Sequence, residues 1–206
     1  TINEGAFIGC SSLKEITIPA TVSKIEGSVF KNLENLTKVV FEDNKSTLTK
    51  ISESSFKGCK KLKELKLPSS LLSIAKDSFS ECTSLEELNI PSSVKNIGSK
   101  AFFKCVSLKK ITIPDKVNSI KISTFSSCTS LQLIIIPNSV TSIGKSAFSG
   151  CKSLTQIEIP SSVTSIGNSA FHGCILLKEI TIPSSVTSIG SSALSGCTSL
   201  TQITIP

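Results

Sequence analysis

The same seven residues, SSVTSIG, stand at positions 161–167 and again at 184–190, which is 23 residues further along the chain. The prolines keep this spacing from position 68 onward, the cysteines from position 59 and the phenylalanines from position 56. All three columns share one irregularity, three extra residues before position 48. Columns that repeat in register indicate short structural units that stack on one another.

The repeating unit is C-x-x-L-x-x-I-x-I-P-x-x-V-x-x-I-x-x-x-A-F-x-x, with eight apolar positions. In one copy these are Cys151, Leu154, Ile157, Ile159, Val163, Ile166, Ala170 and Phe171. A unit this short cannot bury such a face alone, whereas stacked copies bury it as continuous columns. We therefore expect residues 1–206 to form a single solenoid of about nine strand rungs. The solenoid is expected to be an uncapped fragment, with an irregular second repeat at residues 42–48.

Each unit predicts three local structures. The end of L-x-x-I-x-I alternates and is β-branched, which is typical of a strand, and the proline ends it because proline cannot donate to a ladder. V-x-x-I predicts a second short extended segment, followed by a glycine (Gly98, Gly144, Gly167, Gly190) that permits a turn. A-F-x-x-C fits one helical or 3₁₀ turn that faces inward.

This pattern resembles the BspA-type, or treponemal-type, leucine-rich repeat, and the resemblance covers Ile2 to Pro206. It implies an α/β-type leucine-rich repeat solenoid with a parallel β-ladder on the concave face and short strands or 3₁₀ turns elsewhere. The chain lacks the turn asparagine of commoner leucine-rich repeats. Serines stand nearby, and their hydroxyls can bond local backbone in the same way; they are Ser70, Ser93, Ser139, Ser162 and Ser185.

The resemblance also implies a function, a non-enzymatic interaction or adhesion module on a cell-surface protein, with protein or glycan partners that include host matrix proteins. An intracellular scaffold with the same fold is the alternative. A third hypothesis is weak polyanion binding through the lysine-rich N-terminal half, at Lys57, Lys60, Lys61, Lys63 and Lys66.

Charge and hydropathy limit the partners. The net charge is +7, but the 22 basic residues are all lysine, and the lack of arginine argues against nucleic acid as a partner. The sequence contains no run of about 18 consecutive apolar residues, so it predicts no membrane span. Exposed end rungs predict end-to-end self-association.

The cysteines and the single histidine are the candidates for chemistry. Cysteine recurs once per rung without any C-x-x-C pair, so we expect free, buried thiols rather than disulfides or zinc, and no cofactor. His172, two residues before Cys174, is expected at a solvent-facing variable position, which leaves no catalytic set. The expected buried structural residues are Cys59, Cys82, Cys105, Cys128, Cys151, Cys174, Phe79, Phe102, Phe125, Phe148 and Phe171.

The outward positions of L-x-x-I-x-I supply the candidate binding surface. Lys63, Glu86 and Lys109 alternate in sign, and Glu87 stands opposite Lys110, so we expect pairs across the strands. Leu133 and Ile135 are apolar where other rungs are polar, which is either drift or a binding hot spot. The candidate surface comprises Lys63, Lys66, Glu86, Lys109, Lys110, Leu133, Ile135 and Glu158.

Two asparagines, Asn35 and Asn44, stand in N-x-S/T sequons. They are glycosylation candidates if the protein enters a secretory route, and chance matches in a chain rich in Ser and Thr otherwise.

Overall fold

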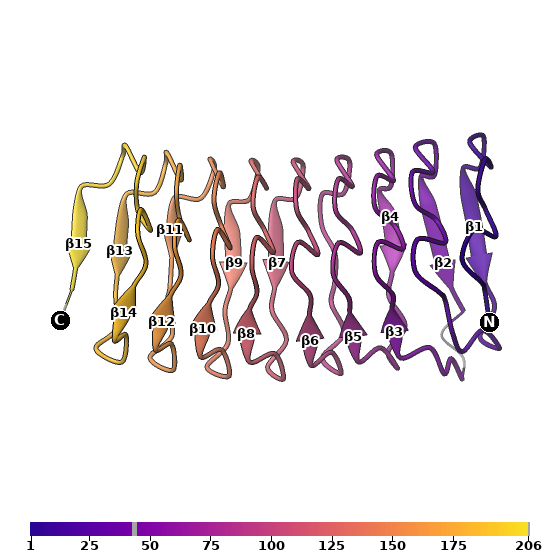
Figure 1. Ribbon diagram of the computed structural model, residues 1–206, viewed down its shortest axis with the longest axis horizontal. Helices are drawn as coiled ribbons and strands as arrows, with labels where there is room; N and C mark the ends of the chain where they lie inside the picture. Colours follow the sequence, from indigo (N-terminus) through magenta and orange to yellow (C-terminus); the bar gives the residue numbers. More distant parts are fainter. Residues whose placement is uncertain (43–44, 206) are drawn as a thin grey trace.

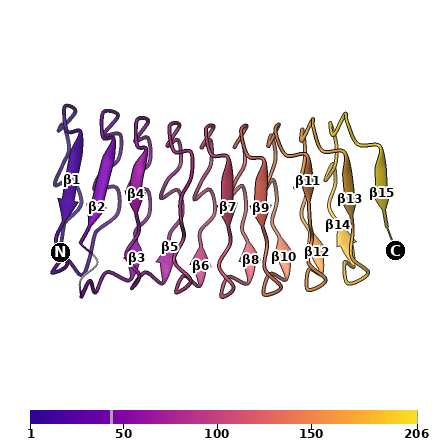
Figure 2. The ribbon, with the colours of Figure 1, turned by 180° about the vertical axis from the view of Figure 1, so that it is seen from behind.

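The computed structural model describes residues 1–42 and 45–205. The chain winds as a parallel β-solenoid of about eight turns of roughly 23 residues, stacked along one long axis with the two termini at opposite ends (Figure 1). Most turns carry a strand of one row and then a strand of a second row, and both views show the two rows running along the solenoid (Figures 1 and 2).

The first row is built from the L-x-x-I-x-I segments. Its strands are β1 (Glu15–Ile18), β2 (Lys38–Phe41), β4 (Glu64–Lys66), β7 (Lys110–Thr112), β9 (Leu133–Ile135), β11 (Gln156–Ile157), β13 (Glu179–Thr181) and β15 (Gln202–Thr204). Hydrogen bonds join them into three sheets, β1-β2-β4, β7-β9 and β11-β13-β15. The fourth rung joins its neighbour through a single bridge, between Glu87 and Lys110.

The second row is built from the V-x-x-I segments. Its strands are β3 (Lys50–Ile51), β5 (Ser73–Ile74), β6 (Asn96–Ile97), β8 (Ser119–Ile120), β10 (Ser142–Ile143), β12 (Ser165–Ile166) and β14 (Ser188–Ile189). They form the sheets β3-β5-β6 and β8-β10-β12-β14. Both rows confirm the predicted parallel ladders, in which equivalent residues of successive rungs are partners, as Ile157 is of Ile180.

The core is a set of side-chain columns between the two rows. Phenylalanine rings form one such column, in which six successive contacts from Phe30 to Phe171 have centroid distances of 5.0–5.6 Å and interplanar angles of 2–15°. These rings are fully buried. Each rung therefore offers the next a matching surface, which is the physical reason for the strict sequence repeat.

The prediction of a helical or 3₁₀ turn at A-F-x-x-C is wrong, because the described residues contain no helix. For the same reason the predicted α/β class is wrong. Lys100 and Lys104 have left-handed φ values of 58° and 57°, which a right-handed helix excludes. The Phe103 amide bonds the Lys100 carbonyl within the rung at 3.1 Å, but the Phe102 amide reaches the next rung, at Thr124 O (2.9 Å). Amides that would bond within a helix thus donate to carbonyls of the neighbouring rung instead.

The glycine after V-x-x-I has a different role from the one predicted. Gly144 and Gly167 do not have a positive φ, so no special turn geometry requires them. A Cβ on Gly167 would lie 2.5 Å from Lys145 N and 2.7 Å from the carbonyl carbon of Gly144. At Gly167, glycine avoids a clash because the backbone of the preceding rung lies this close.

The serines that replace the turn asparagine do bond to backbone, but in the preceding rung rather than locally. The Ser139 hydroxyl donates to Val117 O at 2.6 Å, and the Ser162 hydroxyl donates to Val140 O at 2.6 Å. Ser70, Ser93 and Ser185 make equivalent bonds of 2.6–2.7 Å. Serine therefore stabilises the stacking of rungs.

Candidate interaction surface on the first row of strands

Along each strand of the first row, every second side chain points to solvent, because successive residues of a strand alternate between the two faces of a sheet. In β7, Lys110 and Thr112 are exposed while Ile111 is buried, and β9 and β13 repeat this pattern. The outward face is therefore a lattice of side chains from different rungs.

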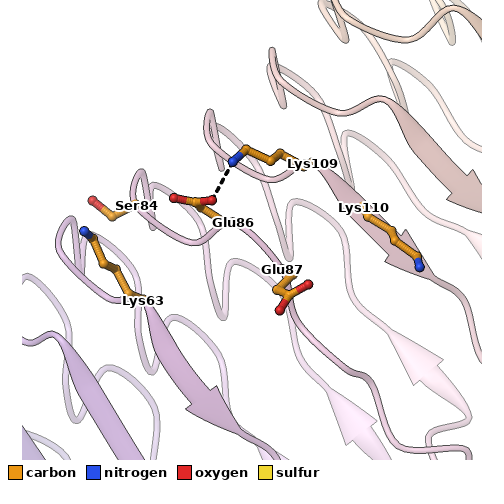
Figure 3. A pocket seen from close by; sticks show the side chains of 6 residues that line it. All are labelled: Lys63, Ser84, Glu86, Glu87, Lys109 and Lys110. Atoms are coloured by element: carbon orange, nitrogen blue, oxygen red, sulfur yellow. Dashed lines mark hydrogen bonds and ion pairs between the residues drawn. The ribbon is translucent and has the colours of Figure 1, made fainter.

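Five of the residues singled out in the sequence meet in one charged pocket. It is lined by Lys63, Ser84, Glu86, Glu87, Lys109 and Lys110 and has a volume of about 440 Å³ (Figure 3). Lys109 Nζ lies 2.6 Å from Glu86 Oε2, which confirms the pairing expected between these rungs. The hydrogen bond and charge of Lys109, with a further contribution from Lys63, lower the pKa of Glu86.

Glu87 and Lys110 behave differently from the prediction. Their backbones are bridge partners, but no ion pair joins their side chains within the part of the chain that the structure describes, and Figure 3 draws them without one. The charged pocket is thus partly neutralised at Glu86 and Lys109 and leaves Lys110 available at its edge.

A second hollow, the apolar groove, lies further along the same face. Its volume is about 590 Å³, and its lining includes Leu133, Ile135, Ile136, Gln156, Glu158, Glu179 and Thr181. Leu133 and Ile135 are 41% and 49% exposed, as expected for outward positions. The sequence pattern therefore located two apolar side chains that do lie at the surface, in a groove with polar residues around them.

The groove lies at one of the two interruptions of the first row. β7 and β9 form one sheet and β11, β13 and β15 form the next, and no sheet pairing joins β9 to β11 in the described chain. On the other side of β9, the Gln132 amide bonds Lys109 O (2.9 Å) and the Ile113 amide bonds Ile135 O (3.0 Å). Backbone groups at the open side of β9 are thus left for solvent or a ligand.

Three of the five lysines proposed for polyanion binding have a side-chain partner within the protein. Lys60 Nζ lies 2.8 Å from Glu34 Oε1, and this hydrogen bond raises the pKa of Lys60. Lys57 lies 3.9 Å from Asp77, and the ammonium of Lys61 donates to Asn35 Oδ1 at 2.8 Å. Partial neutralisation weakens the case for a polyanion surface. Lys66, exposed on β4, lines neither the charged pocket nor the apolar groove.

The two sequons differ in what the structure says of them. Asn35 is half-buried, and its amide nitrogen donates to Ser11 O at 2.9 Å while its oxygen accepts from Lys61, so it links three rungs. Asn44 lies outside the described residues.

The cysteines are free, and Cys59 to Cys174 form a buried column. Each thiol of this column donates to a phenylalanine carbonyl in the preceding rung at 3.1–3.3 Å, as Cys105 does to Phe79 O. Burial raises the pKa of Cys105 to about 12 and that of Cys174 to about 12. His172 is exposed, while the Cys174 thiol bonds Phe148 O instead.

The expectation that every thiol is buried is wrong for the first and the last cysteine of the chain. Cys10 is exposed and Cys197 is half-buried. The first and last rungs of this sequence have a neighbour on one side only in the structure, so their thiols are less covered.

Sequence reasoning missed three features of this surface. Ile136 and Glu179 line the apolar groove, although the repeat pattern places Ile136 in the core and Glu179 at an ordinary outward position. Ile175 and Leu176 form a second exposed apolar pair, 40% and 45% exposed, in the turn after Cys174. That pair could have been found, because other rungs carry mostly polar residues there.

Fold and surface together define a class, a leucine-rich repeat solenoid whose strands present an open side-chain lattice. The family model described as "BspA type Leucine rich repeat region (6 copies)" matches residues 1–132 and 118–206, and the chain belongs to this family. Repeat proteins of this kind typically serve in protein interaction or as surface antigens, and they are generally non-enzymatic scaffolds. No curated protein matches the chain.

Solved structures support the assignment. A leucine-rich repeat protein from Bacteroides ovatus is 30% identical with a TM-score of 0.53, over 92% of this chain and 60% of that protein. One from Eubacterium ventriosum is 26% identical with a TM-score of 0.64, over 95% of this chain and 61% of that protein. The T. pallidum leucine-rich repeat protein shares the fold at 24% identity and a TM-score of 0.69, over 90% of this chain and 77% of its own.

This sequence thus spans about 60% of the length of the first two relatives. Within the described residues there is no helix of the length and hydropathy that crossing a membrane requires.

Proposed function

We propose that this chain is the interaction module of a cell-surface BspA-type protein, and that it binds a protein partner through the outward face of the first row of strands. The observation that carries the proposal is the apolar groove, in which Leu133 and Ile135 are exposed beside polar residues of the neighbouring rungs. An apolar centre with a polar rim has the composition of a binding hot spot.

Family membership supports the non-enzymatic part of the proposal, because such repeats generally act as scaffolds. The buried thiols support it as well. Their pKa values are raised, and a protonated thiol is a poor nucleophile. Exposed His172 therefore has no activated thiol beside it.

The test uses the purified chain on arrays of extracellular proteins and of glycans. We expect a protein ligand whose affinity falls at least tenfold with Leu133→Gln plus Ile135→Thr. Glutamine and threonine occupy the equivalent positions of other rungs, for example Gln156 and Thr181, so the fold is expected to be kept. A matched control, Ile175→Lys plus Leu176→Ser, changes an equally exposed apolar pair elsewhere and should leave binding unchanged.

Ligands that bind both variants equally would contradict the proposed site. Surface display is tested separately, by protease treatment of intact cells that express the full protein. Protection of the chain from protease, with cleavage only after lysis, would favour the intracellular scaffold instead.

A further inference from the structure

The two ends of the apolar groove differ in charge, which the proposed function does not use. Lys110 lies on the N-terminal side, on β7, where it is the strand partner of Leu133. Glu158 and Glu179 lie on the C-terminal side and line the groove itself. A ligand that crosses the groove along the solenoid axis therefore meets a positive charge, then apolar side chains, then two negative charges.

These three charges have no partner of opposite sign, over residues 1–42 and 45–205. Five other glutamates of the chain pair with a lysine at 2.6–3.3 Å. Lysine is abundant in the N-terminal half, but the rungs around Glu158 offer few. The carboxylates at the groove are thus available to a cation on a partner, with an apolar surface beside them that excludes water.

The lining favours a protein segment over a carbohydrate. The floor is aliphatic, from Leu133, Ile135 and Ile136, and no aromatic side chain is among the groove residues. The chain has no Trp and no Tyr, whereas sugar rings typically stack on aromatic faces. A groove of about 590 Å³ lies within the usual range for ligand sites, about 300–1,000 Å³. An aliphatic or aromatic side chain of a partner fits this lining.

We propose that the apolar groove binds an extended segment of a partner protein in which a large apolar residue stands between an acidic and a basic residue. The acidic side chain lies over Lys110, the apolar one over Leu133 and Ile135, and the basic one over Glu158 and Glu179. Three rung steps separate β7 from β13, about 14 Å at ladder spacing, which four to five extended residues span. This inference rests on the proposed function and adds the chemistry and direction of the ligand.

The test is a phage library of random dodecapeptides, selected on the purified chain and counter-selected on Leu133→Gln plus Ile135→Thr. We expect enriched peptides to carry an acidic and a basic residue on opposite sides of a large apolar residue. The best synthetic peptide should lose at least tenfold in affinity for the double variant and none for Ile175→Lys plus Leu176→Ser. Selection on Glu158→Lys plus Glu179→Lys should instead enrich peptides with acidic residues on both sides.

Several outcomes would overturn the inference. The proposed charge order would be refuted if the enriched peptides carried charges of one sign only. It would also be refuted if Glu158→Lys plus Glu179→Lys enriched the same peptides as the unchanged chain. Either result would leave the proposed function intact. Glycan binding that depends on Leu133 and Ile135 would refute the class of ligand. If no peptide depends on these residues, the inference fails, while the protein array still decides the proposed function. Circular dichroism of each variant verifies the fold.

Discussion

Phe102 and Phe103 are adjacent in the chain but occupy opposite environments, and this makes a direct test of what holds the rungs together. The ring of Phe102 is fully buried between Phe79 and Phe125, with centroid distances of 5.6 and 5.4 Å. Phe103 is half-buried, with the ammonium groups of Lys100 and Lys104 at 5.9 and 5.2 Å from its centroid.

Phe102→Ala leaves a cavity in a column that is closed on both sides, and such a change costs about 3–5 kcal/mol of unfolding free energy. Phe102→Leu keeps most of the volume, as Leu194 does in the last rung. It removes two ring contacts of about 0.5–1.5 kcal/mol each, for a loss of about 1–3 kcal/mol. Phe103→Ala loses partly exposed surface and exposed cation–π contacts, and should cost about 1 kcal/mol or less.

Urea unfolding followed by far-ultraviolet circular dichroism measures these losses. The chain has no Trp or Tyr, so intrinsic fluorescence is a weak probe. The slope of the free energy against urea should stay the same in all variants, so that midpoints report stability. A loss below about 1 kcal/mol for Phe102→Ala, or equal losses for Phe102→Ala and Phe103→Ala, would refute the argument that the phenylalanine column stabilises the stack.

Three further predictions concern the thiols and the glycines. The folded-state pKa of Cys105 is about 12 against an ordinary value of 9.0, so its contribution to stability is complete below pH 9 and is lost as the pH rises toward 12. Linkage gives about 1.4 kcal/mol per thiol per pH unit, and urea midpoints measured from pH 8 to 10.5 should fall less steeply in Cys105→Ala. With a thiol-specific reagent, Cys10 should react at once, Cys197 more slowly and the buried thiols only in denaturant; rapid reaction of all eight would show that the column is open. Gly167→Ala should lower stability by about 1–3 kcal/mol, because its Cβ meets the backbone of the preceding rung, and an unchanged urea midpoint would contradict this close approach.

Which side chains are buried was largely predictable from the sequence. The column of Phe79 to Phe171 and the thiols from Cys59 to Cys174 are buried where the 23-residue period places them. The exposure of Leu133 and Ile135 was predictable for the same reason, because outward positions of a strand are set by alternation. A solenoid makes this inference reliable, since every rung faces a near copy of itself.

Local backbone structure in the A-F-x-x-C turns was not predictable. The spacing of Ala101, Phe102 and Cys105 suits a helical turn, but the carbonyls of the next rung compete for the same amides, as Thr124 O does for Phe102 N. The role of glycine was also missed, since a close approach between Gly167 and Gly144 depends on residues 23 positions apart.

The sequence alone determined the length of the rung, the inward and outward residues and the family, because these follow from a period written into one chain. Only the tertiary structure decided which amides bond across rungs, that Lys110 and Glu158 have no ion pair among the described residues, and that the first row is interrupted between β9 and β11. These depend on distances between neighbouring rungs, and small differences between nearly identical repeats set those distances.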